Sequence, residues 1–82
     1  MDSFSIAIDL LRSALQLGPR ADQLTADSPL MGALPEFNSL SVVGLIAGVE
    51  EQTGVGVDDD EITADIFETV GSFANFIAQK LA

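Results

Sequence analysis

The sequence predicts an all-α fold, a four-helix bundle of three main helices and one short helix, with a long loop between the first two. Three stretches repeat apolar residues at the i, i+3, i+4, i+7 spacing of one helix face. Each stretch follows a residue type that caps helices, and glycine follows the first two stretches. We expect a single domain over residues 1–82, because a chain of this length has room for one core at most.

The first helix is expected over residues 3–17. Asp2 or Ser3 can cap its start, and Gly18-Pro19 stops it because proline cannot continue a helix. Its apolar face consists of Phe4, Ala7, Ile8, Leu11, Ala14 and Leu15. Residues 18–38 then form a long loop rich in Pro, Gly, Asp and Ser, with a short helical turn around 31–34. We expect this loop to be pinned to the core by Leu24, Leu30, Leu34 and Phe37.

The second helix is expected over residues 39–53, between the N-cap Asn38 and the stop Gly54, and it carries two apolar stripes. The stripe expected to face the core consists of Val42, Leu45, Ile46 and Val49. The other stripe, which begins beside Ser39 and is expected to face a partner, consists of Leu40, Val43 and Ala47. Alternatively, Leu40 and Val43 are extra core beneath the long loop. The helix contains two interior glycines, Gly44 and Gly48. They either allow a neighbouring group to approach the backbone closely or simply lower the stability of the helix by an amount that the fold tolerates.

After Gly54 the chain is expected to be extended over 55–57 and to form an acidic turn over 58–61. This turn does not match the EF-hand calcium loop, because Thr63 and Thr69 stand where that loop needs glycine and glutamate. No metal site is therefore predicted. Thr63 is expected to cap a single helical turn over 64–67, and Thr69 the last helix over 70–81. The buried stripe of that helix is Val70, Phe73, Ala74, Ile77 and Leu81.

Thirteen acidic residues against three basic ones give a formal charge of −10. Such a chain repels nucleic acids and anionic membrane surfaces and attracts basic protein patches. With no cysteine and no histidine, it lacks thiol nucleophiles, Cys/His zinc ligands and the commonest general base, and we do not expect an enzyme. The N-terminus lacks a secretory signal and no apolar run is long enough to cross a bilayer, so we expect a cytoplasmic monomer without membrane insertion.

The order and spacing of these parts resemble an acyl carrier protein over nearly the whole chain. The resemblance rests on the motif Asn38-Ser39-Leu40, where the family usually has Asp-Ser-Leu, and on the segments that follow it. These are the helix ending Glu-Glu-Gln-Thr-Gly over 50–54, the Val-Gly-Val extension, the acidic turn, Ile62-Thr63, and Thr-Val-Gly-Ser over 69–72. The implied fold is the helical bundle already expected from the periodicity.

The resemblance implies that Ser39 carries 4′-phosphopantetheine, transferred from coenzyme A by a magnesium-dependent phosphopantetheinyl transferase. The thiol of that arm would hold acyl groups as thioesters. By position in the motif, the partner-binding residues would be Asn38, Leu40, Val43, Gly44, Ala47, Glu50 and Glu51. Implied partners besides the transferase are an acyl-AMP ligase, a ketosynthase or an acyltransferase-type enzyme with a basic docking patch. We also expect the acyl chain to enter the bundle partly, against Val42, Ile46, Ile62 and Ala74.

Three departures from the family pattern bear on the pathway. Asn38 replaces the usual aspartate, Gly44 replaces an acid that partners read, and smaller or more polar residues replace apolar ones at Ala47 and Thr53. Together they favour a specialised fatty-acid, polyketide or exopolysaccharide-linked pathway, and residues 29–37 resemble carriers of exosortase-associated gene clusters. Three alternatives remain: a peptidyl or aminoacyl carrier, an acidic helical adaptor without a prosthetic group, and a degenerate carrier left unmodified because of Asn38.

Overall fold

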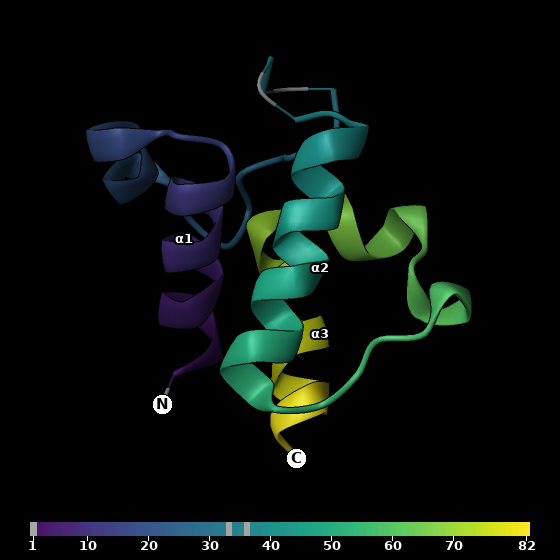
Figure 1. The fold of residues 1–82 in the computed structure, drawn as a ribbon. Coiled ribbons are helices and arrows are strands. Elements are labelled where there is room, and N and C mark those ends of the chain that lie inside the picture. Colours follow the sequence, from purple (N-terminus) through teal and green to yellow (C-terminus); the bar gives the residue numbers. More distant parts are fainter. Residues whose placement is uncertain (1, 33, 36) are drawn as a thin grey trace.

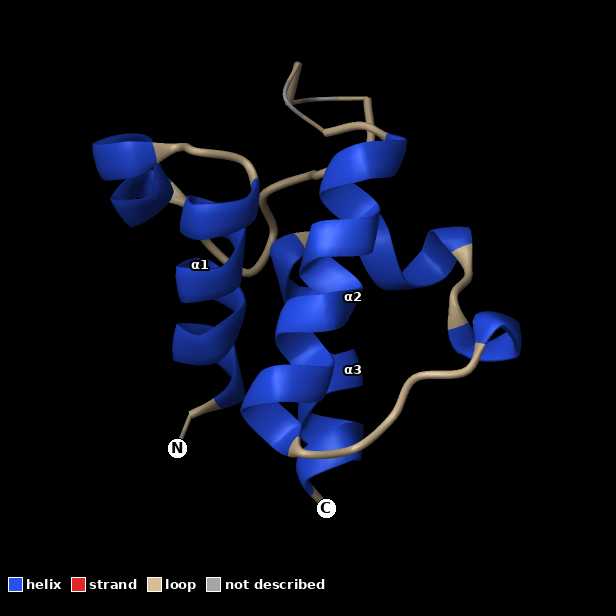
Figure 2. Ribbon diagram, viewed as in Figure 1, coloured by secondary structure: helices blue, strands red, loops and turns tan. Residues whose placement is uncertain are grey.

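The computed structural model describes residues 2–32, 34–35 and 37–82. Three α-helices dominate these residues: α1 (Ser3–Ala14), α2 (Ser39–Thr53) and α3 (Val70–Leu81). Three short 3-10 helices join them, η1 (Gly18–Gln23), η2 (Asp59–Glu61) and η3 (Ala64–Phe67). No strand is drawn in Figure 2, and within the described residues the only strand-like pairing is one isolated bridge between Pro29 and Thr69. The all-α prediction is confirmed, α2 and α3 have the predicted bounds, and η3 is the predicted short helix.

The first helix is shorter than predicted and ends at Ala14 instead of residue 17. Its C-cap, Leu15, donates its backbone N–H to the Leu11 carbonyl at 3.0 Å. The chain then leaves the helix because Gln16 adopts a left-handed φ of 54°. The prediction that Gly18-Pro19 ends the first helix is therefore wrong: the pair starts η1 instead, since the fixed φ of proline suits the first turn of a helix.

The long loop is held against the start of α3, as Figure 1 shows near the middle of the bundle. The Leu30 N–H donates to the Glu68 carbonyl at 3.1 Å, and the Val70 N–H donates to the Ser28 carbonyl at 2.9 Å. Leu30 is fully buried, and the other three predicted anchors, Leu24, Leu34 and Phe37, are half-buried against the core. The anchoring prediction is confirmed. The helical turn predicted over 31–34 lies partly outside the described residues, because Ala33 is not among them.

The core lies between α1, α2 and α3, each of which contacts the other two. Its largest fully buried side chains are Phe73, Leu11, Leu30, Leu45, Ile77, Val49 and Val70. The stripe predicted for α3 is wrong at Leu81, which is 43% exposed because it is the last residue of the helix. Phe76 is buried instead, a position that the sequence pattern did not predict. No helix in the described ranges combines the length and the apolarity that a bilayer crossing needs.

Candidate functional site at the start of helix α2

The start of α2 is closed by a reciprocal hydrogen-bond arrangement between Asn38 and Ser41. The Asn38 Oδ1 accepts from the Ser41 backbone N–H at 3.0 Å, and the Ser41 Oγ accepts from the Asn38 backbone N–H at 2.8 Å. The Ser41 hydroxyl also lies 2.8 Å from the Asn38 carbonyl, to which it can donate. This is a capping box with an amide and a hydroxyl in the two capping positions. The predicted role of Asn38 as N-cap is confirmed.

Ser39 is the first residue of α2 and is exposed, whereas Ser41, two residues later, is only 7% exposed. The capping box therefore uses Ser41 internally, and it holds the backbone around Ser39 in a fixed position. The free N–H groups and the dipole of a helix N-terminus favour negative charge beside this hydroxyl. A phosphate bonded to the Ser39 Oγ would lie where these groups stabilise it.

The second apolar stripe of α2 faces solvent. Leu40 is 83% exposed and Val43 is 67% exposed, and Gly44 and Ala47 are exposed as well. The alternative in which the long loop covers Leu40 and Val43 is therefore wrong. Met31, the residue that could have folded over them, is itself half exposed. The apolar surface beside Ser39 thus remains open for a partner.

Two hollows lie along α2 and share Val42 as a lining residue. One, of about 280 Å³, is lined by Met31, Gly32, Phe37, Asn38, Ser39 and Val42. The other, of about 340 Å³, lies between α2 and the segment 55–62; we call it the α2 groove, and it is lined by Val42, Val43, Ile46, Ala47, Glu50, Val57, Asp59 and Ile62. The mostly apolar lining residues of the two hollows therefore follow α2 from Ser39 to the region opposite Ile62. Ala74, which we expected to contact the acyl chain, is buried and lines neither hollow.

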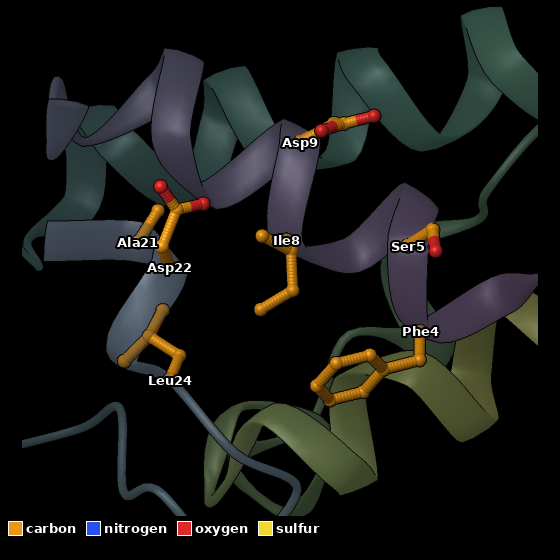
Figure 3. A pocket seen from close by; sticks show the side chains of 7 residues that line it. All are labelled: Phe4, Ser5, Ile8, Asp9, Ala21, Asp22 and Leu24. Atoms are coloured by element: carbon orange, nitrogen blue, oxygen red, sulfur yellow. The ribbon is translucent and has the colours of Figure 1, made fainter. Parts of the chain in front are cut away.

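A further hollow of about 230 Å³ lies between α1 and η1, as Figure 3 shows. Its lining residues are Phe4, Ser5, Ile8, Asp9, Ala21, Asp22 and Leu24, and none of them belongs to α2. Arg12 bridges its two acids, with donor–acceptor distances of 3.0 Å to Asp9 and 2.5 Å to Asp22. The pair with Asp9 lies within α1, whereas the pair with Asp22 joins α1 to η1, and the sequence pattern predicted neither.

Glu50 and Glu51 lie on the exposed surface at the C-terminal end of α2. One carboxylate oxygen of Glu50 accepts a hydrogen bond from the Val57 backbone N–H at 2.8 Å, so this side chain also holds the segment after α2. That internal role has no counterpart in helical periodicity, because it joins residues seven apart across Gly54. Among the described side chains, no three carboxylates gather in a way that could hold a metal ion.

The family model for the phosphopantetheine attachment site matches residues 7–77. No curated protein sequence gives a match. Among solved structures, the solution NMR structure of a holo acyl carrier protein from Nitrosomonas europaea is similar, with a TM-score of 0.88 and 44% sequence identity. The match covers 99% of this chain and 98% of that one. By sequence and by fold, this chain belongs to the phosphopantetheine-bearing family of acyl carrier proteins, whose covalent cofactor is 4′-phosphopantetheine.

Proposed function

We propose that Ser39 is the attachment residue of this chain and that the protein carries acyl groups between enzymes of a specialised pathway. The observation that carries the proposal is the exposure of the Ser39 side chain at the first position of α2. A hydroxyl in this place is accessible to a transferase, and the helix N-terminus accepts the phosphate that modification adds.

The residues around Ser39 fit the phosphopantetheine group. The prosthetic group supplies a terminal thiol on which an acyl chain is held as a thioester, and this chain has no cysteine that could supply one. The Asn38–Ser41 box keeps the first turn of α2 intact and uses the Ser41 N–H, which leaves the backbone N–H groups of Ser39 and Leu40 for the added phosphate. The nearby hollow lined by Met31, Phe37 and Val42 offers apolar contacts beside the attachment point.

The α2 groove is the seat that we propose for the start of the acyl chain. Val42, Ile46 and Ile62 supply its apolar lining, which suits a saturated hydrocarbon. The carboxylates of Glu50 and Asp59 also line the groove and would repel a cargo with a negatively charged end. We therefore favour an uncharged acyl chain over a dicarboxylic one.

Partner enzymes would dock on the exposed stripe of α2 beside the attachment point. The chain's net charge of −10 steers basic surfaces toward it and raises association rates more than affinity. Weak and fast docking suits a carrier that must leave one enzyme to reach the next. Gly44 and Ala47 make this face flatter than a stripe of large side chains, which favours a few dedicated partners, such as an acyl-AMP ligase or a ketosynthase, over many.

Modification in vitro tests the attachment residue. The protein is incubated with coenzyme A, magnesium and a broad-specificity phosphopantetheinyl transferase, and the intact mass is measured. We expect a single mass gain of one phosphopantetheine, lost in Ser39→Ala and kept in Ser13→Ala, a matched control because Ser13 is an exposed helical serine in α1. No gain with several transferases would favour the acidic adaptor, unless Asn38→Asp restores it, which would identify a degenerate carrier.

Mass analysis of the protein recovered from its own cells separates the remaining alternative. An acyl carrier would show hydrocarbon thioesters on the arm, released by hydroxylamine. An amino-acid adduct on the same arm would instead identify a peptidyl or aminoacyl carrier. The α2 groove favours the first outcome because most of its lining residues are apolar and suit a hydrocarbon chain.

A further inference from the structure

We propose that Lys80 is a positioning residue that holds segment 55–62 in place as the outer wall of the α2 groove. Through that wall it determines how well a medium-length acyl chain is sheltered from water. The inference rests on the acyl-carrier function proposed above. It concerns a side chain at the far end of the molecule from Ser39, near the C-terminal end of α3.

The surroundings of Lys80 are unusual for the only lysine of the chain and its only base after Arg20. Its side chain is only 13% exposed. The ammonium group forms an ion pair with the Glu61 carboxylate and donates to the Gly56 carbonyl at 3.3 Å. It also lies 5.7 Å from the ring centroid of Phe76, within the range of a cation–π interaction. A shielded charge with several partners is positioned more firmly than a solvated surface lysine.

The two polar partners of the Lys80 ammonium group, Gly56 and Glu61, both lie in segment 55–62. Gly56 lies in the extended link after α2, and Glu61 is the last residue of η2. Glu61 in turn accepts from the Asp58 backbone N–H at 2.9 Å, which closes η2 onto the same carboxylate. Lys80 therefore joins the beginning and the end of the segment to α3, and Figure 1 shows that the segment runs along the side of the bundle away from α1.

The same segment forms one wall of the α2 groove. Val57, Asp59 and Ile62 line the groove from the segment, opposite Val42 and Ile46 of α2. On the α2 side two backbone N–H groups of the segment donate to side chains: Val57 to Glu50 at 2.8 Å and Val55 to the Thr53 hydroxyl at 3.2 Å. Among the described residues, the polar contacts of the wall are thus two hydrogen bonds to the C-terminal part of α2 and, on the α3 side, the contacts of the Lys80 ammonium group.

Removing the ammonium group should loosen the wall without unfolding the helices. The half-buried side chains of Val57 and Ile62 would still favour the closed position, because they pack against the core. Segment 55–62 would nevertheless open more often, since a short link without regular helix is ordered mainly by such contacts. A thioester-linked chain lying in the groove would then meet water more often.

The test compares Lys80→Met, which keeps an unbranched apolar side chain but no charge, with Lys80→Arg, which restores the charge. Arg12→Met is the matched control, because it removes the same charge and an ion pair on the opposite side, between α1 and η1. Each protein is loaded with an acetyl or an octanoyl thioester, and the rate of hydroxylamine cleavage is measured. Amide hydrogen exchange of residues 56–62 is followed on the same proteins without cargo.

We expect Lys80→Met to raise the octanoyl cleavage rate about fivefold relative to acetyl, as expected for the loss of one partly shielded ion pair. Exchange at Val57 and Ile62 should accelerate, exchange within α1 should not, and Lys80→Arg should restore both readouts. An unchanged octanoyl-to-acetyl ratio would overturn the proposal, as would an equal change in Arg12→Met. If Lys80→Met fails to fold, Glu61→Gln removes the same ion pair with a neutral side chain of equal size and decides the question.

Failure of this proposal and failure of the carrier function give different results. If no transferase modifies Ser39, the carrier function is wrong, yet hydrogen exchange still reports whether Lys80 holds the segment. If Ser39 is modified and loaded while the octanoyl ratio is insensitive to Lys80, the carrier function stands and the positioning role is wrong.

Discussion

Gly48 of α2 lies directly against the Leu10 side chain of α1. A Cβ atom built on Gly48 would lie 2.5 Å from the Leu10 Cδ2, well inside van der Waals contact. At Gly44, one turn earlier, an added Cβ would lie at an ordinary 3.7 Å from the Ala14 Cβ. Only one of the two interior glycines therefore admits a close neighbour, while the other is a tolerated weakness of the helix.

Alanine should accordingly have different effects at the two glycines. Gly44→Ala should raise the free energy of unfolding by about 1 kcal/mol, the usual difference in helix propensity. Gly48→Ala gains the same propensity but must displace the end of the Leu10 side chain, so its net effect should be smaller. Urea denaturation of both variants measures the difference, and a Gly48→Ala variant as stable as Gly44→Ala would contradict this account of the α1–α2 contact.

The capping box predicts the effect of changing Asn38. Asn38→Ala removes the acceptor for the Ser41 N–H and should lower the free energy of unfolding by about 1 kcal/mol. Asn38→Asp keeps an acceptor and adds a negative charge at the helix N-terminus, so it should be at least as stable as the parent. Thermal unfolding at low and high salt checks both. The advantage of aspartate should shrink at high salt if it arises from the helix dipole.

Substitution of Leu30 tests how strongly the long loop is anchored to the bundle. Its side chain is fully buried, and its backbone N–H bonds to Glu68 just before α3. Leu30→Ala should lower the free energy of unfolding by about 2–5 kcal/mol, as for other buried leucines. Met31→Ala is the control, because Met31 is half exposed and should change stability little. Equal losses in the two variants would mean that the loop is not anchored through Leu30.

The ion pair of Glu61 predicts a dependence of stability on pH. The hydrogen bond with Lys80, then the one from the Asp58 N–H, hold the pKa of Glu61 below its usual value of about 4.5, although partial burial opposes this. A carboxylate with a lowered pKa in the folded state adds stability at neutral pH, and that stability is lost as pH falls through the folded pKa.

The measurement is the difference in unfolding free energy between the parent and Glu61→Gln from pH 7 downward. The subtraction cancels the effects of pH on charge repulsion that the two proteins share. The difference should favour the parent at pH 7 and shrink below the usual pKa of glutamate. A difference that stays constant over this range would mean that Glu61 is not stabilised as an anion by Lys80.

Periodicity and caps were sufficient to predict most of the fold. The Asn38 and Thr69 caps and the Gly54 stop lie close in sequence to the helices that they bound, so the bounds of α2 and α3 followed from local chemistry. The early end of α1 did not, because nothing in the residue type of Gln16 announces a left-handed conformation. The start of α2 was likewise predictable, since its capping residues are three apart.

The parts of the site that depend on distant contacts could not be predicted in the same way. The Val57 N–H donates to Glu50, seven residues earlier in the sequence. Lys80 contacts Gly56, 24 residues earlier, and Glu61. Acidic runs are usually solvated, so composition gave no reason to single out Glu61 from its neighbours. These contacts form only when α2 and α3 pack together, so local sequence patterns do not predict them.

The backbone hydrogen bonds between the long loop and the start of α3 limit how the segment around Ser39 could be grafted onto another protein. A peptide that copies residues 37–54 would have the same sequence around Ser39 but would not hold that serine at the start of a stable helix, because short isolated helices are marginally stable in water. The loop that delivers the chain to Asn38 is fastened through Leu30 to Glu68 and through Ser28 to Val70. Any engineered host for this serine must therefore include, along with the helix, the residues at the start of α3 to which the loop is hydrogen-bonded.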